Sequence, residues 1–207
     1  PEQVTARRGG GSGGLVLSVG LTPNLRTRPI LDGMFHADGI TMNPLELHPS
    51  ELFWRQLKFA EFDIAEMSMS SLLMATARGD DRFVGLPVFS THYFFQNWIM
   101  IRKDSGIKKP EDFAGRRIGV PEYQMTAAVW QRGILKDEFG IEPWEVSWRT
   151  GGLEETGREE RTPINLPEKF DCQRIGPDQT LSRMLESGEL DAVICPPVPS
   201  CLQRGAA

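Results

Sequence analysis

The stretch from Gly115 to Leu135, GRRIGVPEYQMTAAVWQRGIL, constrains the fold more than any other part of the sequence. Residues 116–120 have the pattern of a short strand that follows a glycine turn, and residues 121–124 form a polar loop. From Met125 to Leu135, apolar residues recur at spacings of three and four, which predicts a helix. A strand, a loop and a helix in direct succession are typical of an α/β fold.

The loop of this unit is a candidate anion site. In an open α/β sheet such a loop lies at the carboxyl ends of the strands, where ligands bind. The helix that follows offers unpaired backbone N–H groups and about half a positive charge at its N-terminus. Glu122, Tyr123, Gln124 and Thr126 place ionisable and hydrogen-bonding groups within this short segment. The plain alternative is an ordinary loop that touches only water, which is the commoner case for loops in general.

Composition narrows the classes of protein to be considered. The chain has 207 residues, 40% of them hydrophobic and 25% charged, which is enough for one large domain or two small ones. The net charge of −5 argues against a nucleic-acid-binding protein, although a small anionic ligand needs only a local positive site. No stretch approaches the roughly 18 apolar residues of a membrane span. We therefore expect no nucleic acid and no membrane span, and composition leaves room for a small anionic ligand.

Other features bear on the compartment and on cofactors. Residues 1–14 are rich in Gly and predict a flexible Gly/Ser tail without the apolar segment of a secretory signal. The three cysteines, Cys172, Cys195 and Cys201, fit no metal-ligand spacing, and their odd number favours reduced thiols. We expect a cytoplasmic protein, with a periplasmic one as the alternative if an upstream signal has been removed. No metal and no cofactor are expected, since neither a ligand cluster nor a glycine fingerprint occurs.

The rest of the chain alternates between short strands and helices. We divide it into the tail (1–14), a first α/β lobe (15–102), a second α/β lobe (103–197) and the start of a return crossover (198–207). In the first lobe we expect strands over 15–20, 40–47, 62–67, 82–89 and 96–102 and helices over 25–33, 51–60 and 72–78. In the second we expect a helical turn over 110–113, strands over 116–120, 145–149 and 190–195, helices over 125–135 and 178–185, and a loop over 153–172.

Several motifs carry a resemblance to known proteins. KKPEDFAGRRIGV at residues 108–120 and GELDAV at residues 188–193 resemble the motifs that open and close the second lobe of the type II periplasmic-binding-protein fold. More specifically, GVPEYQMTAAVWQRG at residues 119–133 resembles the 4,5-dihydroxyphthalate decarboxylase family, and so do residues 62–67, 77–83 and 86–89. The resemblance runs from about Leu15 to Cys201. It implies a two-lobed α/β fold, with the ligand between the lobes and the C-terminal part of the first lobe missing.

The resemblance also implies an activity, a cofactor-independent carboxy-lyase acting on an aromatic or related carboxylic acid. One segment departs from the family pattern, which carries arginines where this chain has His92 and Phe95. Those guanidinium groups would suit a dianionic aromatic dicarboxylate. The departure leaves the expected substrate at the level of an aromatic or related carboxylic acid.

Decarboxylation without a cofactor needs a held carboxylate, a proton donor and stabilisation of the charge that builds on the ring. As catalytic residues we predict Glu66, His92 and Glu122. Glu66 could equally be a partner of a helix dipole, and His92 could equally be a surface residue. The predicted substrate-binding residues are Ser68, Ser70, Tyr123, Gln124, Thr126, Arg26 and Gly151.

Each binding candidate has a structural alternative. Ser68 and Ser70 are first of all helix N-cap candidates, and Tyr123 could simply pack. The commoner fate of Arg26 is a solvated surface, and Gly151 could belong to a plain turn. Trp130, one turn into the predicted helix, is interpreted as a core residue rather than a stacking platform.

The same residues fit a second function. A non-catalytic solute-binding protein of the ABC-transporter type would hold a small carboxylate or heteroaromatic ligand with the same backbone N–H groups. Its partner would be a transporter permease. A third class is a ligand-sensing regulatory domain, which needs a DNA-binding partner domain. The oligomeric state stays open.

Overall fold

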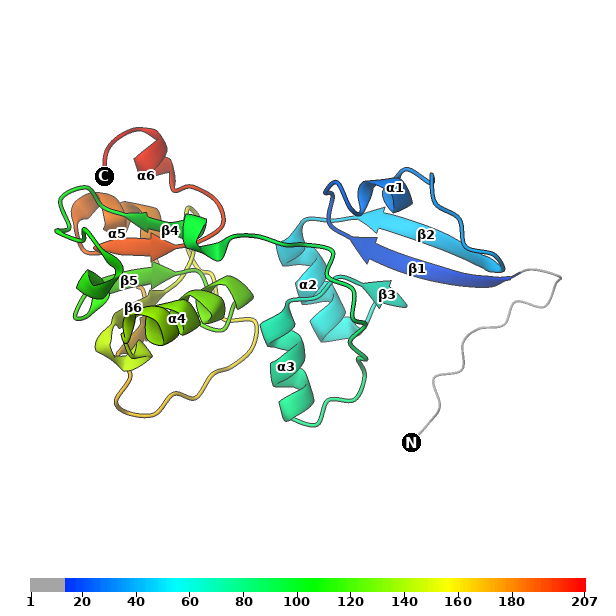
Figure 1. Ribbon diagram of the computed structural model, residues 1–207, viewed down its shortest axis with the longest axis horizontal. Helices are drawn as coiled ribbons and strands as arrows, with labels where there is room; N and C mark the ends of the chain where they lie inside the picture. Colours follow the sequence, from blue (N-terminus) through cyan, green and yellow to red (C-terminus); the bar gives the residue numbers. More distant parts are fainter. Residues whose placement is uncertain (1–13) are drawn as a thin grey trace. The chain divides into compact units, whose positions relative to one another are not determined.

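Two separate β-sheets organise the chain in a computed structural model, which describes residues 14–207 (Figure 1). The chain divides accordingly into two units, and the first comprises the residues up to Ser68 together with Met74–His92. The second unit comprises Met69–Leu73 and Tyr93–Ala207. The predicted tail lies outside the described residues apart from Gly14.

The first unit contains a three-stranded parallel sheet in the order β2-β1-β3. β2 pairs only with β1, so Pro44 lies on an edge strand, as expected from its missing N–H group. The carboxyl ends of the two other strands lead into Thr22 and Glu66. The elements are β1 (Leu15–Leu21), α1 (Arg28–Leu31), β2 (Ile40–Glu46), α2 (Pro49–Phe59), β3 (Ile64–Ala65) and α3 (Met69–Ala77). The first turn of α3 is grouped with the second unit.

Close packing of α2 against β1 fixes the core of the first unit. Leu52 is fully buried, and a Cβ at Gly20 would lie 2.6 Å from its Cδ1 atom, so the strand needs glycine there. Gln56 donates to the carbonyl of Phe62 at 3.2 Å and accepts from its N–H at 3.0 Å. The helix begins two residues earlier than predicted, because the ring nitrogen of His48 accepts from the backbone N–H of Ser50.

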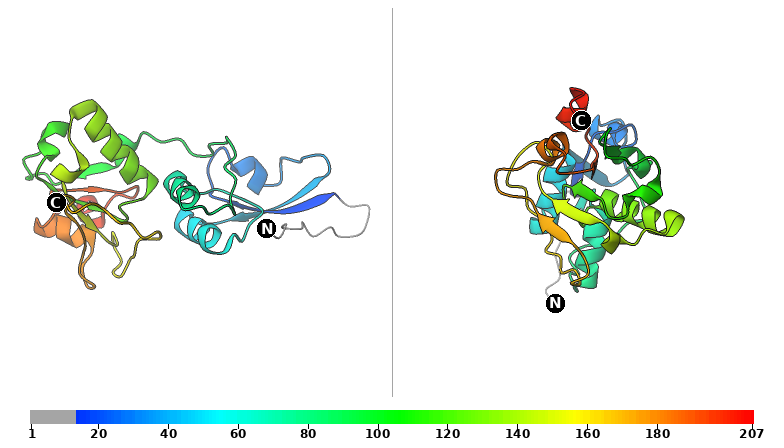
Figure 2. Two further views of the ribbon diagram at one scale, coloured as in Figure 1. Left: turned by 90° about the horizontal axis from the view of Figure 1, so that it is seen from below. Right: turned by 90° about the vertical axis from the view of Figure 1, so that its left-hand side faces the viewer.

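The second unit is built on a five-stranded sheet in the order β4-β8-β5-β6-β7. All neighbouring strands are parallel except β4 and β8. The helices α4 and α5 cover opposite faces of this sheet (Figure 2). The elements are η1 (Phe95–Trp98), β4 (Ile99–Ile101), η2 (Pro110–Phe113), β5 (Arg117–Val120), α4 (Thr126–Phe139), η3 (Pro143–Glu145), β6 (Ser147–Thr150), β7 (Cys172–Arg174), α5 (Leu181–Ser187), β8 (Ala192–Ile194) and α6 (Ser200–Gln203).

Successive side chains of β5 point to opposite faces of the sheet, so this one strand contributes to the hydrophobic core on each face. Ile118 and Val120 point into the core that α4 covers. Gly119 lies on the other face, where a Cβ would stand 2.8 Å from Leu190 and 2.9 Å from Leu181. The strand therefore brings α5 and the segment after it close to the backbone only because this position has no side chain.

Several sequence predictions need correction. The predicted strand over residues 82–89 is wrong, since the described chain has no helix or strand between α3 and η1. Gly85 and Pro87 interrupt that apolar run, and both are unfavourable within a strand. The segment 96–102 forms a 3-10 turn followed by β4, which pairs with β8 in the second sheet rather than extending the first lobe. Residues 198–207 are grouped with the second unit, where the hydroxyl of Ser200 lies 3.2 Å from that of Ser182 on α5, and their assignment as the start of a return crossover stays a prediction.

Among residues 14–207, no helix combines the length and the apolar character that crossing a bilayer requires.

Candidate functional site

The structure distributes the predicted site residues over both units. Arg26, Glu66, Ser68 and His92 belong to the first unit. Ser70, Glu122, Tyr123, Gln124, Thr126 and Gly151 belong to the second.

In the first unit, Glu66 joins the carboxyl ends of two neighbouring strands. Its Oε2 atom accepts from the backbone N–H of Thr22 at 2.8 Å and also from the Thr22 hydroxyl. Its Oε1 atom is buried and has no hydrogen-bond partner among the described residues. A buried carboxylate oxygen of this kind needs a ligand or a water molecule, which is compatible with the predicted catalytic role.

Arg26 and His92 lie in exposed parts of the first unit. The backbone N–H of Arg26 donates to the side chain of Asn24 at 2.8 Å, which shapes the loop after β1. The ring of His92 packs edge-on against Phe89, with 6.1 Å between the ring centroids. Ser68 occupies the N-cap position of α3, but its side chain makes no capping hydrogen bond, so its predicted role in ligand binding stays a prediction.

In the second unit, the first turns of α3 and α4 meet. The hydroxyl oxygen of Thr126 accepts from the backbone N–H of Ser70 at 3.2 Å and lies 3.2 Å from the Ser70 hydroxyl. Ser71 donates to the side-chain oxygen of Gln124 at 3.3 Å. The structure therefore brings together three residues that the sequence predicted as ligand-binding, and it adds Ser71.

Glu122 is the most completely enclosed charge of the site. Its side chain is 1% exposed and accepts hydrogen bonds from Arg158 at 2.5 Å and from Arg161 at 2.9 Å. The side-chain amide of Gln124 donates to the same carboxylate at 2.9 Å. Burial opposes ionisation of Glu122, but the two arginines outweigh it and lower its pKa. The lowered pKa favours the ionised carboxylate, which holds the loop through its hydrogen bonds, and the catalytic role of Glu122 stays a prediction.

The side chain of Tyr123 packs into the core, as its structural alternative predicted. Its ring meets Trp148 edge-on at 5.7 Å, and the guanidinium of Arg132 lies 3.7 Å from its centroid. Burial raises the pKa of the Tyr123 hydroxyl. The phenol therefore stays neutral, and what this residue offers to the site is its backbone N–H.

That N–H has a partner that sequence reasoning missed. It donates to the Oε1 atom of Glu160 at 2.5 Å. Burial, with a contribution from the neighbouring charge of Glu122, raises the pKa of Glu160. Glu160 lies in a segment that we call the strap, residues 157–162. The only signal in the sequence is a run of mixed charges, Arg158, Glu159, Glu160 and Arg161, since such a run in an aperiodic loop can pair with charges on a neighbouring loop.

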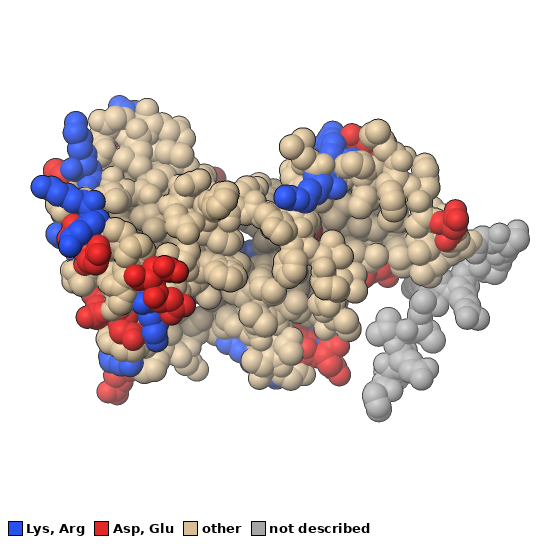
Figure 3. Space-filling model, in the orientation of Figure 1, with Lys and Arg blue, Asp and Glu red and all other residues tan. Residues whose placement is uncertain are grey.

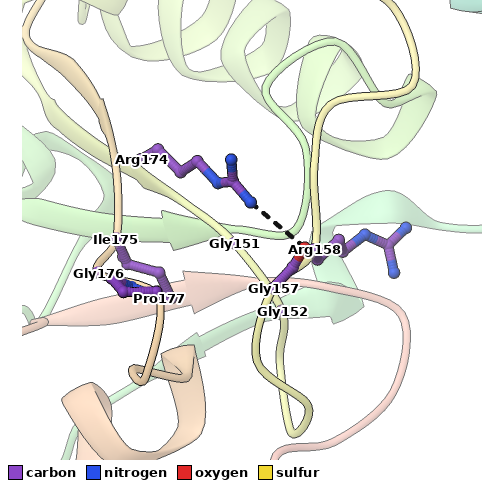
Figure 4. A pocket seen from close by; sticks show the side chains of 8 residues that line it. All are labelled: Gly151, Gly152, Gly157, Arg158, Arg174, Ile175, Gly176 and Pro177. Carbon is purple, nitrogen blue, oxygen red and sulfur yellow. Dashed lines mark hydrogen bonds between the residues drawn. The ribbon is translucent and has the colours of Figure 1, made fainter.

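Gly151 lines a cavity of about 260 Å³ at the carboxyl ends of β6 and β7 (Figure 4). A Cβ at Gly151 would lie 2.4 Å from the side chain of Ile175, so glycine is required for this approach. Arg174 reaches across the cavity and donates to the carbonyl of Gly157 at 3.3 Å, whereas the Arg158 side chain points away from Arg174 (Figure 4). The lining residues are Gly151, Gly152, Gly157, Arg158, Arg174, Ile175, Gly176 and Pro177.

Two of the other sequence interpretations concern aromatic residues. Trp130 was interpreted as a core residue, but it is 55% exposed. Its ring stacks nearly parallel to Phe95, with 6.3 Å between centroids and an interplanar angle of 9°. Phe95 is one of the two positions at which the sequence departs from the family pattern, so an aromatic stack stands where the pattern has an arginine.

Charged side chains of both signs lie intermixed over the second unit on the face shown in Figure 3. Several form ion pairs, such as Arg117 with Asp191 and Arg102 with Asp104. Within residues 14–207, no group of three or more His, Cys, Asp or Glu side chains is placed to hold a metal ion.

Comparison with known proteins places the chain among characterised relatives. Residues 31–153 match the family described as "NMT1/THI5 like", which has the type II periplasmic-binding-protein-like fold. The chain resembles the alkanesulfonate-binding protein SsuA from Xanthomonas axonopodis pv. citri with a TM-score of 0.48 and 15% identity, over 89% of this chain and 55% of that one.

Two relatives are much more similar in sequence. The chain is 42% identical over 191 residues to 4,5-dihydroxyphthalate decarboxylase from Pseudomonas putida, covering 92% of this chain and 74% of that protein. It is 39% identical over 191 residues to the enzyme of the same name from Comamonas testosteroni, covering 92% of this chain and 58% of that protein. The chain belongs to the 4,5-dihydroxyphthalate decarboxylase family, within the NMT1/THI5-like proteins.

Proposed function

We propose that the protein is a decarboxylase that acts on an aromatic or related carboxylic acid without a cofactor. The observation that carries the proposal is the 42% identity to the Pseudomonas putida 4,5-dihydroxyphthalate decarboxylase over 92% of this chain. Two features of the second unit support it. Backbone N–H groups precede a 14-residue helix, and an ionised Glu122 with two arginines holds their loop in place.

The reaction requires the carbon–carbon bond to the carboxylate to break, with the electron pair staying on the ring carbon. CO2 leaves, and a proton then replaces it on the ring. In this proposal the N-terminal turn of α4 holds a carboxylate of the substrate, and Thr126, Ser70 and Gln124 fix its orientation. Glu66 is the proposed proton donor, since one of its carboxylate oxygens has no hydrogen-bond partner among the described residues. His92 is the second candidate for that role.

The substrate class follows from the relatives and from the departures in this sequence. Both relatives are named as decarboxylases of 4,5-dihydroxyphthalate, a compound that carries two adjacent carboxylates. Phe95 and Trp130 offer a stacked aromatic surface where the family pattern has one of two arginines. We therefore include aromatic monocarboxylates beside the dicarboxylate among the proposed substrates.

The test is incubation of the purified protein with 4,5-dihydroxyphthalate, phthalate and 3,4-dihydroxybenzoate, each followed by mass spectrometry of released CO2 and by titration calorimetry. Catalysed release from at least one acid supports the enzyme. Binding of an acid without any release of CO2 would contradict the proposal and support the alternative, a solute-binding protein for a small carboxylate.

The two functions imply different partners and compartments. For the enzyme we propose the cytoplasm, supported by the free thiols of Cys172, Cys195 and Cys201. The solute-binding alternative goes with the periplasm and with a transporter permease as partner. Co-purification with a permease, together with binding but no turnover, would favour that alternative.

A further inference from the structure

The backbone amides before α4 already hold a carboxylate that belongs to the protein. Oε1 of Glu160 lies 2.5 Å from the backbone N of Tyr123, and the N–H of Gln124 donates to the same carboxylate. Consecutive N–H groups that converge on one carboxylate make an anion-binding concavity. Glu160 comes from the strap, 37 residues further along the chain.

The surroundings of Glu160 are unfavourable for a purely structural contact. Its second oxygen, Oε2, is buried and has no hydrogen-bond partner in the described part of the chain. The negative charge of Glu122 stands nearby and acts against the ionised form of Glu160. A buried carboxylate with half of its hydrogen-bonding capacity unused is costly compared with the same group in water.

A buried positive charge acts on this carboxylate. Arg132 is 8% exposed, and its Nη1 atom has no hydrogen-bond partner among residues 14–207. Its charge acts on Glu160, and burial lowers the pKa of Arg132. The site thus combines two N–H donors with an enclosed guanidinium that still has an N–H group to offer, which is the donor set that a carboxylate ligand requires.

We propose that the amides of Tyr123 and Gln124, with Arg132 behind them, are the substrate's carboxylate-binding site, and that Glu160 is an internal occupant which the substrate carboxylate displaces. The inference rests on the proposed function for the identity of the substrate, but the site itself is defined by its own contacts. In the ligand-free protein the strap covers the loop before α4. When a ligand binds, the Glu160 side chain leaves the backbone amides and the ligand carboxylate takes its place.

The anchoring of the strap permits such an exchange. Arg158 and Arg161, on either side of Glu160, bind Glu122 and can keep the strap in place while the Glu160 side chain turns away. Gly157 and Arg158 also line the cavity of about 260 Å³, so open space adjoins the strap. The exchange therefore requires a side-chain rotation and a local backbone shift rather than unfolding of the second unit.

The first experiment removes the occupant and supplies a free carboxylate. In Glu160→Ala, sodium acetate should raise the midpoint of thermal unfolding by roughly 2–4 °C more than sodium chloride at equal ionic strength. The wild type and the control Glu159→Ala should show no such difference, because Glu159 pairs with Arg174 outside the amide site. Equal responses of all three proteins to acetate would overturn the inference.

The second experiment keeps the hydrogen bond from Tyr123 but removes the negative charge of residue 160, so that this side chain binds the amides less tightly. Glu160→Gln retains an oxygen that accepts from Tyr123 but loses the charge, so it should fold and compete less well. Calorimetry with phthalate should then show an affinity about three- to tenfold higher than that of the wild type, and Glu159→Gln should match the wild type. Unchanged or weaker binding in Glu160→Gln would contradict displacement.

The two proposals fail in different ways. If no acid releases CO2 but acetate stabilises Glu160→Ala selectively, the carboxylate site stands and the decarboxylase proposal falls. If CO2 is released but acetate has no selective effect and Glu160→Gln does not bind phthalate more tightly, the enzyme stands and the displacement of Glu160 is refuted.

Discussion

The carboxylate of Glu122 and the guanidinium of Arg161 form a buried ion pair between residues 39 positions apart in the sequence. Arg158 binds the same carboxylate from the other end of the strap. The pair joins the loop before α4 to a segment without helix or strand, and so decides where the backbone amides of Tyr123 and Gln124 lie.

Glu122→Gln should destabilise the protein by about 3 kcal/mol, because it leaves two largely enclosed arginines without their shared counter-charge. The free energy of unfolding can be measured by urea denaturation. The matched control is Glu159→Gln, which removes an exposed partner of Arg174 and should change stability by less than about 0.5 kcal/mol. Similar losses in both variants would show that the Glu122 cluster is not a structural centre.

The contribution of Glu122 should depend on pH in a defined direction. Its pKa is lowered in the folded protein, so the unfolded chain binds the proton more readily as the pH falls. The stabilisation is therefore complete above the ordinary glutamate pKa of about 4.3 and is lost as the pH falls through the lower folded value. The difference in unfolding free energy between wild type and Glu122→Gln should shrink between pH 6 and pH 3. A difference that stays constant over this range would contradict the assignment.

Gly119→Ala should destabilise the second unit by about 1–3 kcal/mol, because the new Cβ would stand 2.8 Å from Leu190 and 2.9 Å from Leu181. Gly133→Ala, in the middle of α4, is the matched control, since nothing lies within 4 Å of its Cβ position. That substitution should be neutral or stabilise by up to about 1 kcal/mol, because alanine favours the helix. Thermal unfolding of the two variants side by side tests both the packing of β5 and the placement of α4.

These examples show which parts of the fold are predictable from sequence. The strand–loop–helix unit over residues 117–139 follows from a local pattern, and Gly188 ends α5 in the left-handed conformation that glycine favours. The apolar run over residues 82–89 was predicted as a strand because hydrophobicity alone does not show whether a partner strand is available. The same limitation hid the pairing of β4 with β8, which lies nearly a hundred residues further along the chain.

The sequence predicts only those site residues that lie within or next to the loop before α4 or at the start of α3. Ser70, Gln124 and Thr126 were chosen because they stand at loop ends and helix starts, and the structure brings them together. Arg158, Glu160 and Arg161 were missed because they lie in an aperiodic segment and act on a loop more than 35 residues away. Local periodicity contains no information about such pairs.

Thr126→Val should weaken binding of phthalate by about five- to tenfold while leaving the protein folded, because it removes a hydroxyl at the start of α4 with little change in volume. The backbone N–H of Ser70 also loses an acceptor, so the stability should fall by about 1 kcal/mol. Thr41→Val, on the exposed side of the edge strand β2, is the control and should change neither property. Unchanged calorimetric affinity in Thr126→Val would count against the position of the site.

Glu66→Gln should lower the turnover number by about a hundredfold and change substrate affinity less than twofold, because a glutamine cannot supply the proton. His92→Gln tests the second candidate in the same way, and the residue with the larger effect on turnover is the donor. Equal losses of binding and turnover in either variant would assign that residue to ligand binding alone.

The most direct measurement is the mass spectrum of the CO2 formed from 4,5-dihydroxyphthalate labelled with ¹³C in its carboxyl groups. The account predicts ¹³CO2 at a rate far above the spontaneous reaction with the wild-type protein, and a strongly reduced rate with Thr126→Val at low substrate concentration. If the labelled acid binds and no ¹³CO2 forms above the spontaneous rate, the protein is not a decarboxylase of this substrate and the central claim is wrong.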